Sequence, residues 1–96
     1  MGDQSGQAEA LNGLGEVLLA AGQAARAVAQ HREALSLASK IGDKYEQARA
    51  ESGLAHSYQV AGDIGRARHH WEQALALYTS LGVPEADHVR AQPAAR

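Results

Sequence analysis

The chain has 96 residues, with 9 basic and 11 acidic side chains, no cysteine and no phenylalanine. The near balance of charge argues against a nucleic-acid surface, which needs an excess of clustered Lys and Arg. The lack of cysteine excludes disulfides and thiolate metal sites. No apolar run approaches the ~20 residues of a membrane span, and the N-terminus lacks a signal-peptide pattern. We therefore expect a soluble, cytoplasmic protein without a membrane partner.

The first half of the chain predicts two helices. Asp3 is suited to cap the start of a helix over about 4–20, and Gly22 lies where that helix is expected to end in a left-handed turn. A second helix is expected over about 24–40, with Gly42 as its stop. The chain's 21 alanines favour helix but bury little apolar area, so the helices have to approach one another closely.

The second half of the chain repeats these signals. Asp43 followed by Glu46 predicts an N-cap and its capping-box partner for a helix over about 44–60. Asp63 is suited to cap a further helix over about 64–81. Glycines stand just after both helices, as they do in the first half.

A short fifth helix is expected over about 84–91, because Pro84 suits the first turn of a helix. Pro93 then ends this helix, and residues 93–96 are predicted to form a disordered tail. The loops between the helices have only a few residues, so consecutive helices must run antiparallel.

The chain matches itself when it is shifted by 40 residues. AGQAARAVAQHREALSLA (21–38) aligns with AGDIGRARHHWEQALALY (61–78), with seven of eighteen positions identical. The predicted fold is therefore all-α, with antiparallel helix–turn–helix repeats that form a fragment of an α-solenoid. We predict a single domain over 1–92, with units over about 3–41 and about 43–81 followed by the capping helix.

The spacing within each unit resembles the tetratricopeptide repeat, whose signature is W-x2-L-G-x2-Y followed by A-x3-F and a proline. The first unit has L-x2-L-G-x2-L over 11–18 and A-x3-H over 27–31. The second has E-x2-L-A-x2-Y over 51–58 and A-x3-W over 67–71. The first aromatic and the final proline are missing, and the period is longer than the usual one of about 34 residues. HEAT-type repeats share this longer period, but the spacing of small and aromatic residues favours the tetratricopeptide family.

Tetratricopeptide units of this length resemble those in the C-terminal regions of large bacterial transcriptional regulators and signalling ATPases. The resemblance implies a non-catalytic protein–protein interaction module, in which the first helix of each unit lines a concave groove for a partner peptide or helix. Carried over position by position, the groove residues are Glu9, Asn12, Glu16 and Leu19 from the first unit and Arg49, Ser52, His56 and Gln59 from the second. A groove that clamps a C-terminal carboxylate needs lysines here, and this chain has Glu16 and His56 instead.

Other chemistry has little support in the residues. No two of the five histidines are three or four positions apart, so no metal site is predicted. Arg66 and Arg68 lie between Asp63 and Glu72, which indicates a solvated helix face rather than direct binding of nucleic acid. No motif for nucleotide binding or nucleophilic catalysis is present. We therefore expect no enzyme activity and no cofactor.

The conspicuous aromatic and histidine side chains are interpreted by their place in the repeat. Trp71 is predicted to fill the core, with His31 half-buried at the equivalent position of the first unit, whereas His69 and His70 are expected on the surface. Repeat arrays usually need about three units, and this chain has two, so its first helix would expose a face that a preceding repeat normally covers. The alternative function is therefore structural self-association, as a homodimer or by helix exchange between chains.

Overall fold

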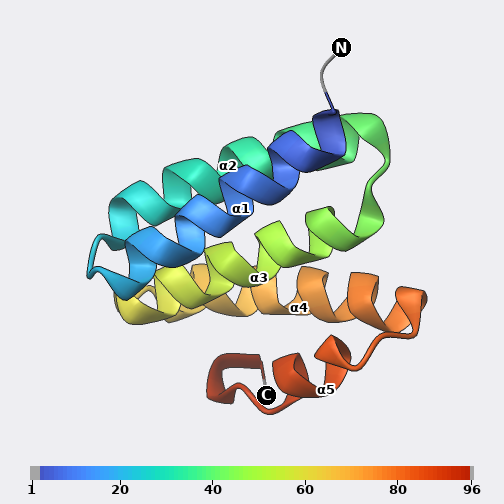
Figure 1. Ribbon diagram of the computed structural model, residues 1–96. Helices are drawn as coiled ribbons and strands as arrows, with labels where there is room; N and C mark the ends of the chain where they lie inside the picture. The colour runs from blue at the N-terminus through green and yellow to red at the C-terminus, as the bar shows by residue number, and fades with distance from the viewer. Residues whose placement is uncertain (1–2, 96) are drawn as a thin grey trace.

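The computed structural model describes residues 3–95, which form five α-helices and one 3-10 turn (Figure 1). The elements are α1 Gln4–Ala20, α2 Ala24–Ile41, α3 Lys44–Val60, α4 Ile64–Leu81, α5 Glu85–Arg90 and η1 Pro93–Ala95. This part of the chain contains no strand, so the predicted all-α fold is confirmed. Every helix begins and ends within one residue of its predicted bounds. Within the same residues, no helix combines the length and the apolar composition that crossing a membrane requires.

Consecutive helices run antiparallel and stack one after another (Figure 1). α1 packs against α2, α2 against α3, and α3 against α4, while α1 and α3 also touch each other directly. α1 and α3 begin 40 residues apart, as do α2 and α4, so the second pair of helices repeats the first. α5 and η1 pack on α4. As a result α3 packs against three long helices, whereas α1 packs against two.

Carboxylate caps begin α1, α3 and α4, and a left-handed glycine follows each of the four long helices, as predicted. The side chains of Asp3, Asp43 and Asp63 accept hydrogen bonds from the backbone N–H three residues later, at 3.0, 3.1 and 3.1 Å. Four glycines at the helix ends have φ between 70° and 85°: Gly22, Gly42, Gly62 and Gly82. Side chains with a Cβ rarely adopt this conformation, so glycine is what allows the chain to reverse within so few residues.

The core combines many small residues with a few large side chains, of which Trp71 is the largest that is fully buried. Trp71 is 1 % exposed, and its Nε1 donates a hydrogen bond to Oε1 of Gln59 at 3.0 Å. The predicted core role of Trp71 is therefore confirmed. The small residues at the helix crossings are all buried: Gly15, Ala27, Ala34, Ala55, Ala67 and Ala74. With so little side-chain volume between them, the helices can pack closely and gain many van der Waals contacts.

The prediction of a disordered tail is wrong for residues 93–95. Pro93–Ala95 form a 3-10 turn, and Ala94 is buried. The backbone oxygen of Ala94 accepts a hydrogen bond from Nε of Arg68 at 3.4 Å. The turn is ordered because it returns the chain onto α4, where a methyl group is small enough to be buried. Arg96, the last residue of the predicted tail, and residues 1–2 of the predicted domain lie outside the described residues.

The expectation of a surface position is wrong for one histidine of the adjacent pair. His69 is exposed, but the imidazole of His70 lies with Nδ1 2.7 Å from Oε1 of Glu51. The same ring stacks on Tyr58, with centroids 5.6 Å apart and planes inclined by 11°. Because Glu51 and Tyr58 belong to α3 and His70 to α4, the histidine joins the two helices of the second unit.

Candidate functional site

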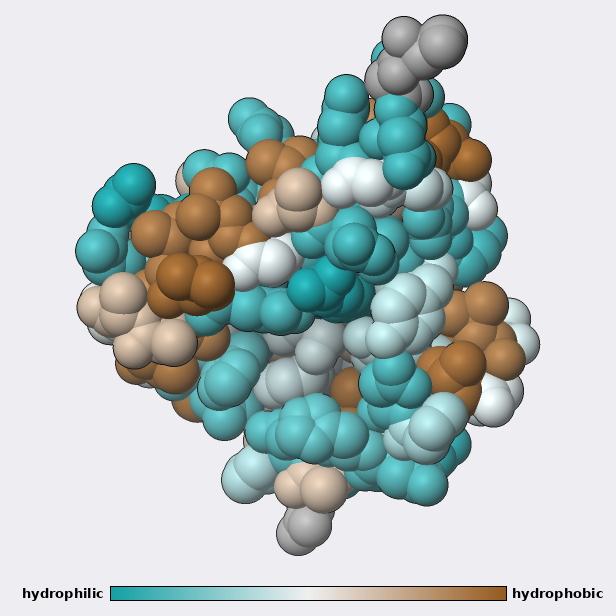
Figure 2. All heavy atoms as spheres, in the orientation of Figure 1, coloured by the Kyte–Doolittle hydropathy of each residue, from teal (hydrophilic) through white to brown (hydrophobic). Residues whose placement is uncertain are grey.

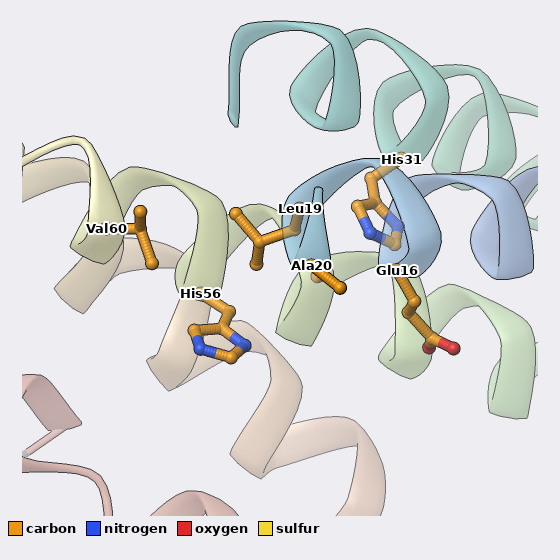
Figure 3. A pocket seen from close by; sticks show the side chains of 7 residues that line it. Glu16, Leu19, Ala20, His31, His56 and Val60 are labelled. Carbon is orange, nitrogen blue, oxygen red and sulfur yellow. The ribbon is translucent and has the colours of Figure 1, made fainter. Parts of the chain in front are cut away.

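A pocket of about 370 Å³ opens between α1 and α3 (Figure 3). It is lined by Glu16, Leu19 and Ala20 of α1, His31 of α2, and Gly53, His56 and Val60 of α3. We call this pocket the α1–α3 groove. The aliphatic side chains form its walls, while the carboxylate and the two imidazoles supply its polar groups. Its volume lies in the range of about 300–1,000 Å³ that is common for ligand sites.

The structure brings together only part of the predicted groove set. Glu16, Leu19 and His56 line the groove. Arg49 is bonded to Glu16 beside it. Glu9 is exposed farther along α1, with its backbone oxygen 3.5 Å from Nη1 of Arg49. These residues come from α1 and α3, and the ion pair of Glu16 and Arg49 joins the two helices beside the groove.

The other predicted residues lie elsewhere. Ser52 is half-buried and does not border the groove. Gln59 accepts the hydrogen bond from Trp71 and lines a separate hollow of about 280 Å³ near η1. Asn12 is 0 % exposed, so its prediction as a groove residue is wrong. Its side chain points into the space between the helices rather than toward a partner.

Asn12 is buried because it completes a chain of hydrogen bonds across three helices. Its Nδ2 donates to the backbone oxygen of Glu46 at 3.1 Å and to Oε1 of Glu46 at 3.0 Å, and its Oδ1 lies 2.8 Å from Nδ1 of His31. Glu46 was expected to bond back to the N–H of Asp43, and this is wrong: that N–H donates to Ala38 at 2.9 Å instead. The carboxylate of Glu46 turns toward α1 because a buried amide needs acceptors.

A bidentate ion pair joins α1 to α3 at the edge of the groove. Nε and Nη2 of Arg49 lie 2.9 Å from Oε2 and Oε1 of Glu16, and Nη1 lies 3.3 Å from Oε1 of Glu46. The hydrogen bonds from Arg49 lower the pKa of Glu16 below its ordinary value, so Glu16 is ionised at neutral pH. Two parallel N–H···O bonds fix orientation as well as distance. The pair therefore sets the spacing of the two helices that form the groove.

His31 is 1 % exposed, more deeply buried than the predicted half-buried position. Its ring occupies a slot between two glycines. A Cβ on Gly15 would lie 2.5 Å from Nε2 of the ring, and a Cβ on Gly53 would lie 2.3 Å from it, so neither position has room for a side chain. Burial lowers the pKa of His31 to about 4, so the ring is neutral at neutral pH.

Sequence reasoning missed Ala20, His31, Gly53 and Val60 as groove residues. Gly53 carried a signal, because glycine inside a helix costs about 1 kcal/mol relative to alanine and therefore indicates a close contact. Val60 stands four residues after His56, one turn farther along the same helix face, so the spacing also pointed to it. His31 carried no such signal, since its position on the second helix of its unit placed it in the core.

His56 connects the groove to the core. It is exposed, and its ring centroid lies 6.5 Å from that of Trp71, with planes inclined by 36°. In residues 3–95 no group of three or more His, Asp or Glu side chains is arranged to hold a metal ion. The groove thus offers apolar walls, one ionised carboxylate and hydrogen-bonding imidazoles, a set suited to noncovalent binding of a side chain.

The sequence was compared with curated proteins and with models of protein families. A search of curated proteins gives no match. The family model described as tetratricopeptide repeat matches residues 6–80, a range that contains nearly all of α1 to α4. Tetratricopeptide repeats generally mediate protein–protein interaction and are typically non-catalytic. Because the match covers most of its residues, the chain belongs to the tetratricopeptide repeat family.

Proposed function

We propose that the chain is a non-catalytic protein–protein interaction module that binds a peptide or helix of a partner in the α1–α3 groove. The observation that carries the proposal is the groove itself, in which an apolar wall stands beside fixed charge. Val60 on α3 lines the groove and is 59 % exposed, and ionised Glu16 lines it from α1. A largely apolar hollow with a few oriented polar groups is the usual form of a site for side chains of a partner.

The residues proposed to contact the partner follow from their positions. Glu16, Leu19 and His56 line the groove and are proposed to touch the bound segment directly. Arg49 and Glu9 flank it and are proposed to set its orientation by charge. For Ser52 and Gln59 we propose only secondary contacts, beyond the ends of the groove.

We also propose that the module is the C-terminal repeat part of a larger bacterial regulatory protein in the cytoplasm, such as a transcriptional regulator or a signalling ATPase. The support is the resemblance of its repeat units to those of such proteins. Within that protein we propose a single domain over 1–92 that works without a cofactor and without direct contact to nucleic acid or membrane. The partner is then another protein, or another segment of the same one.

Charge reversal at the groove tests the interaction. Peptides selected from a random display library for binding to the intact chain are titrated against Glu16→Arg, Arg49→Glu and the double variant. We expect each single change to weaken binding about tenfold or more, because a rim charge then repels the partner. The double variant re-forms the ion pair with opposite polarity, and it is expected to remain weak.

The exposed carboxylate of Glu33 on α2 supplies a matched control, because Glu33→Arg changes the net charge equally on another helix. This variant is expected to bind like the unaltered chain. Binding that is unchanged in both Glu16→Arg and Arg49→Glu would remove the groove assignment. If the double variant regained the affinity for the peptides, the ion pair would act only by holding α1 and α3 together and not by contacting the partner.

The alternative function, self-association, is supported by the outer face of α1. Leu14 is 46 % exposed and Val17 is 65 % exposed. Their counterparts 40 residues later, Leu54 and Ser57, are 1 % and 0 % exposed because α2 packs on α3. A hollow of about 400 Å³ lies on the same helix, bordered by Gln7, Ala10, Leu11 and Leu14. Figure 2 shows hydrophobic side chains gathered over the C-terminal end of α1.

Sedimentation at increasing concentration tests self-association. If α1 of one chain packs on another chain, Val17→Glu should shift the chain to monomer because it places a charge in an apolar contact. Leu81→Glu is the control, since Leu81 is 39 % exposed on α4, away from this face. A well-folded chain that stays monomeric at high micromolar concentration contradicts the alternative.

A further inference from the structure

We propose that the α1–α3 groove contains a subsite for a primary ammonium group on an apolar stem, the chemistry of a lysine side chain, with Nε2 of His31 as its hydrogen-bond acceptor. The inference rests on the proposed function of the groove and specifies part of the partner's chemistry. It starts from one polar atom at the floor of the groove.

Nε2 of His31 is the one buried side-chain polar atom in residues 3–95 that has no hydrogen-bond partner. The His31 ring is 1 % exposed and borders the groove. Figure 3 shows the ring reaching from α2 toward the space beside Leu19, Ala20 and Glu16 of α1. Buried polar atoms in folded proteins are almost always paired, so an unpaired one at the floor of a pocket indicates a bound group.

The hydrogen bonds of Asn12 decide the role of this atom. Nδ2 of Asn12 faces two oxygens of Glu46 and donates to both, so Oδ1 of Asn12 is the atom that faces His31 and can only accept. Nδ1 of His31 must therefore carry the hydrogen. A neutral imidazole carries hydrogen on one nitrogen, which leaves Nε2 with a free lone pair. The group that binds there must be a donor.

In the second unit, the equivalent ring nitrogen has a hydrogen-bond partner within the unit. Trp71 stands at the position equivalent to His31, and its ring nitrogen is paired by Gln59. The position equivalent to Gln59 in the first unit is Leu19, which lines the groove and has no polar atom in its side chain. The first unit therefore leaves Nε2 of His31, whose residue borders the groove, without a hydrogen-bond partner of its own.

The remaining groups of the groove favour an ammonium over a neutral donor. Glu16 and Glu46 share the single guanidinium of Arg49, so two carboxylates face one cation at this edge. Each carboxylate oxygen accepts more than one hydrogen bond, and an ammonium has three donors and no acceptor. One donor is placed on Nε2 and another on Glu16, while Leu19 and Val60 contact the methylene stem.

Small probes separate hydrogen bonding from charge. n-Butylammonium has donors and a charge, N,N,N-trimethylbutylammonium has the charge without donors, and 1-butanol has a donor without the charge. Each is titrated into the intact ¹⁵N-labelled chain, and the resonance of Nε2 of His31 and the amides of Gly15 and Gly53 are followed by NMR. We expect saturable binding of butylammonium that shifts Nε2, with the other two probes at least about tenfold weaker.

Substitutions at Leu19 provide a matched pair of variants. Leu19→Gln places an amide where Gln59 stands in the second unit, so it should pair with Nε2 and weaken butylammonium binding about tenfold or more. Leu19→Met keeps an apolar side chain of similar volume and leaves Nε2 free, so binding should be retained. His31→Phe removes the acceptor and should abolish the binding. If His31→Phe does not fold, the two Leu19 variants still decide the question.

Each contrary result overturns a defined part of the proposal. Butanol binding as tightly as butylammonium would remove the ammonium preference. Trimethylbutylammonium binding as tightly would remove Nε2 as the acceptor, and so would equal binding by Leu19→Gln and Leu19→Met. These outcomes leave the peptide titrations with Glu16→Arg and Arg49→Glu untouched. The subsite and the proposed groove function therefore fail separately.

Discussion

At position 31 the chain places an imidazole where its second unit places the indole of Trp71. The indole needs one acceptor and finds it in Gln59 of the same unit. The imidazole instead bonds to Asn12 of α1, and Asn12 bonds to Glu46 of α3. A histidine in this place thus depends on polar side chains from two other helices. Both of these side chains, Asn12 and Glu46, are buried. A buried hydrogen-bond network that joins three helices favours one arrangement of the core.

Protonation of His31 should destabilise the folded chain in mild acid. Burial keeps the pKa of His31 at about 4 in the folded chain, against an ordinary value of 6.5. Between these values the unfolded chain binds a proton that the folded chain does not. The stabilisation by neutral His31 is therefore complete above pH 6.5 and is lost as the pH falls toward 4, by on the order of 3 kcal/mol in total.

Urea unfolding at neutral pH and at about pH 4.5 measures this loss. In His31→Phe the difference between the two conditions should be much smaller, because the titrating group is gone. The variant keeps every other titratable side chain, so the difference between the two chains reports on residue 31. An identical pH dependence of the two chains would contradict the assignment.

Gly13 and Gly53 stand at equivalent positions of the repeat but should respond to alanine in opposite directions. A Cβ on Gly53 would lie 2.3 Å from the ring of His31, whereas the nearest atom to a Cβ on Gly13 is Nη2 of Arg49 at 3.8 Å. Gly53→Ala should therefore lower the free energy of unfolding by about 1–3 kcal/mol through overpacking. Gly13→Ala should raise it by about 0.5–1 kcal/mol, because alanine favours helix. Urea unfolding of the two variants measures these changes. If both variants were more stable than the unaltered chain, the ring of His31 would not be packed tightly against Gly53.

At the scale of the helices, the ends were predictable because each depends on residues close to it in sequence. Asp3 caps a backbone N–H three residues away, and Gly22 supplies a left-handed turn wherever it occurs. Asn12 was not predictable in this way, since its partners Glu46 and His31 are 34 and 19 residues distant. Only tertiary packing decides whether such an amide meets water or another helix. The same holds for Ala94, which α4 buries although it follows a proline near the end of the chain.

Hydrogen exchange should differ between the two helices that form the groove. α3 packs against α1, α2 and α4, whereas α1 packs against only α2 and α3. Local opening costs less free energy where fewer apolar contacts are lost. Amides in the middle of α1 should therefore exchange about tenfold faster or more than those in the middle of α3 at a concentration where the chain is monomeric. Equal protection of the α1 and α3 amides from exchange would show that the number of neighbouring helices does not set the local stability.

At the scale of the whole molecule, the two units are not interchangeable. The buried amide of Asn12 needs a carboxylate from the following unit, which Glu46 supplies. The residue equivalent to Glu46 in the first unit is Gly6, and the residue equivalent to Asn12 in the second is Ser52. The first unit therefore requires a particular successor, whereas the ring of the second unit is paired within its own helices.

Two fusions of equal length test this order. Residues 43–82 are placed ahead of Asp3 in one chain, and residues 3–42 in the other. Both cover the exposed face of α1, and both should raise the free energy of unfolding, as an added repeat does in helical arrays. The second fusion should gain about 1–3 kcal/mol less, because the Asn12 of its leading copy meets Gly6 and stays unpaired. Equal gains in urea unfolding would show that the order of units does not matter.

The chain contains a single tryptophan, and His56, which lines the groove, lies with its ring centroid 6.5 Å from that of the indole. The emission of an indole depends on the groups beside it, and a nearby imidazole quenches it to a degree set by distance and protonation. A segment that shifts His56 on entering the groove therefore changes the fluorescence of Trp71 without touching it. The single tryptophan is therefore an optical probe with which the proposed binding in the groove can be tested on the unlabelled chain.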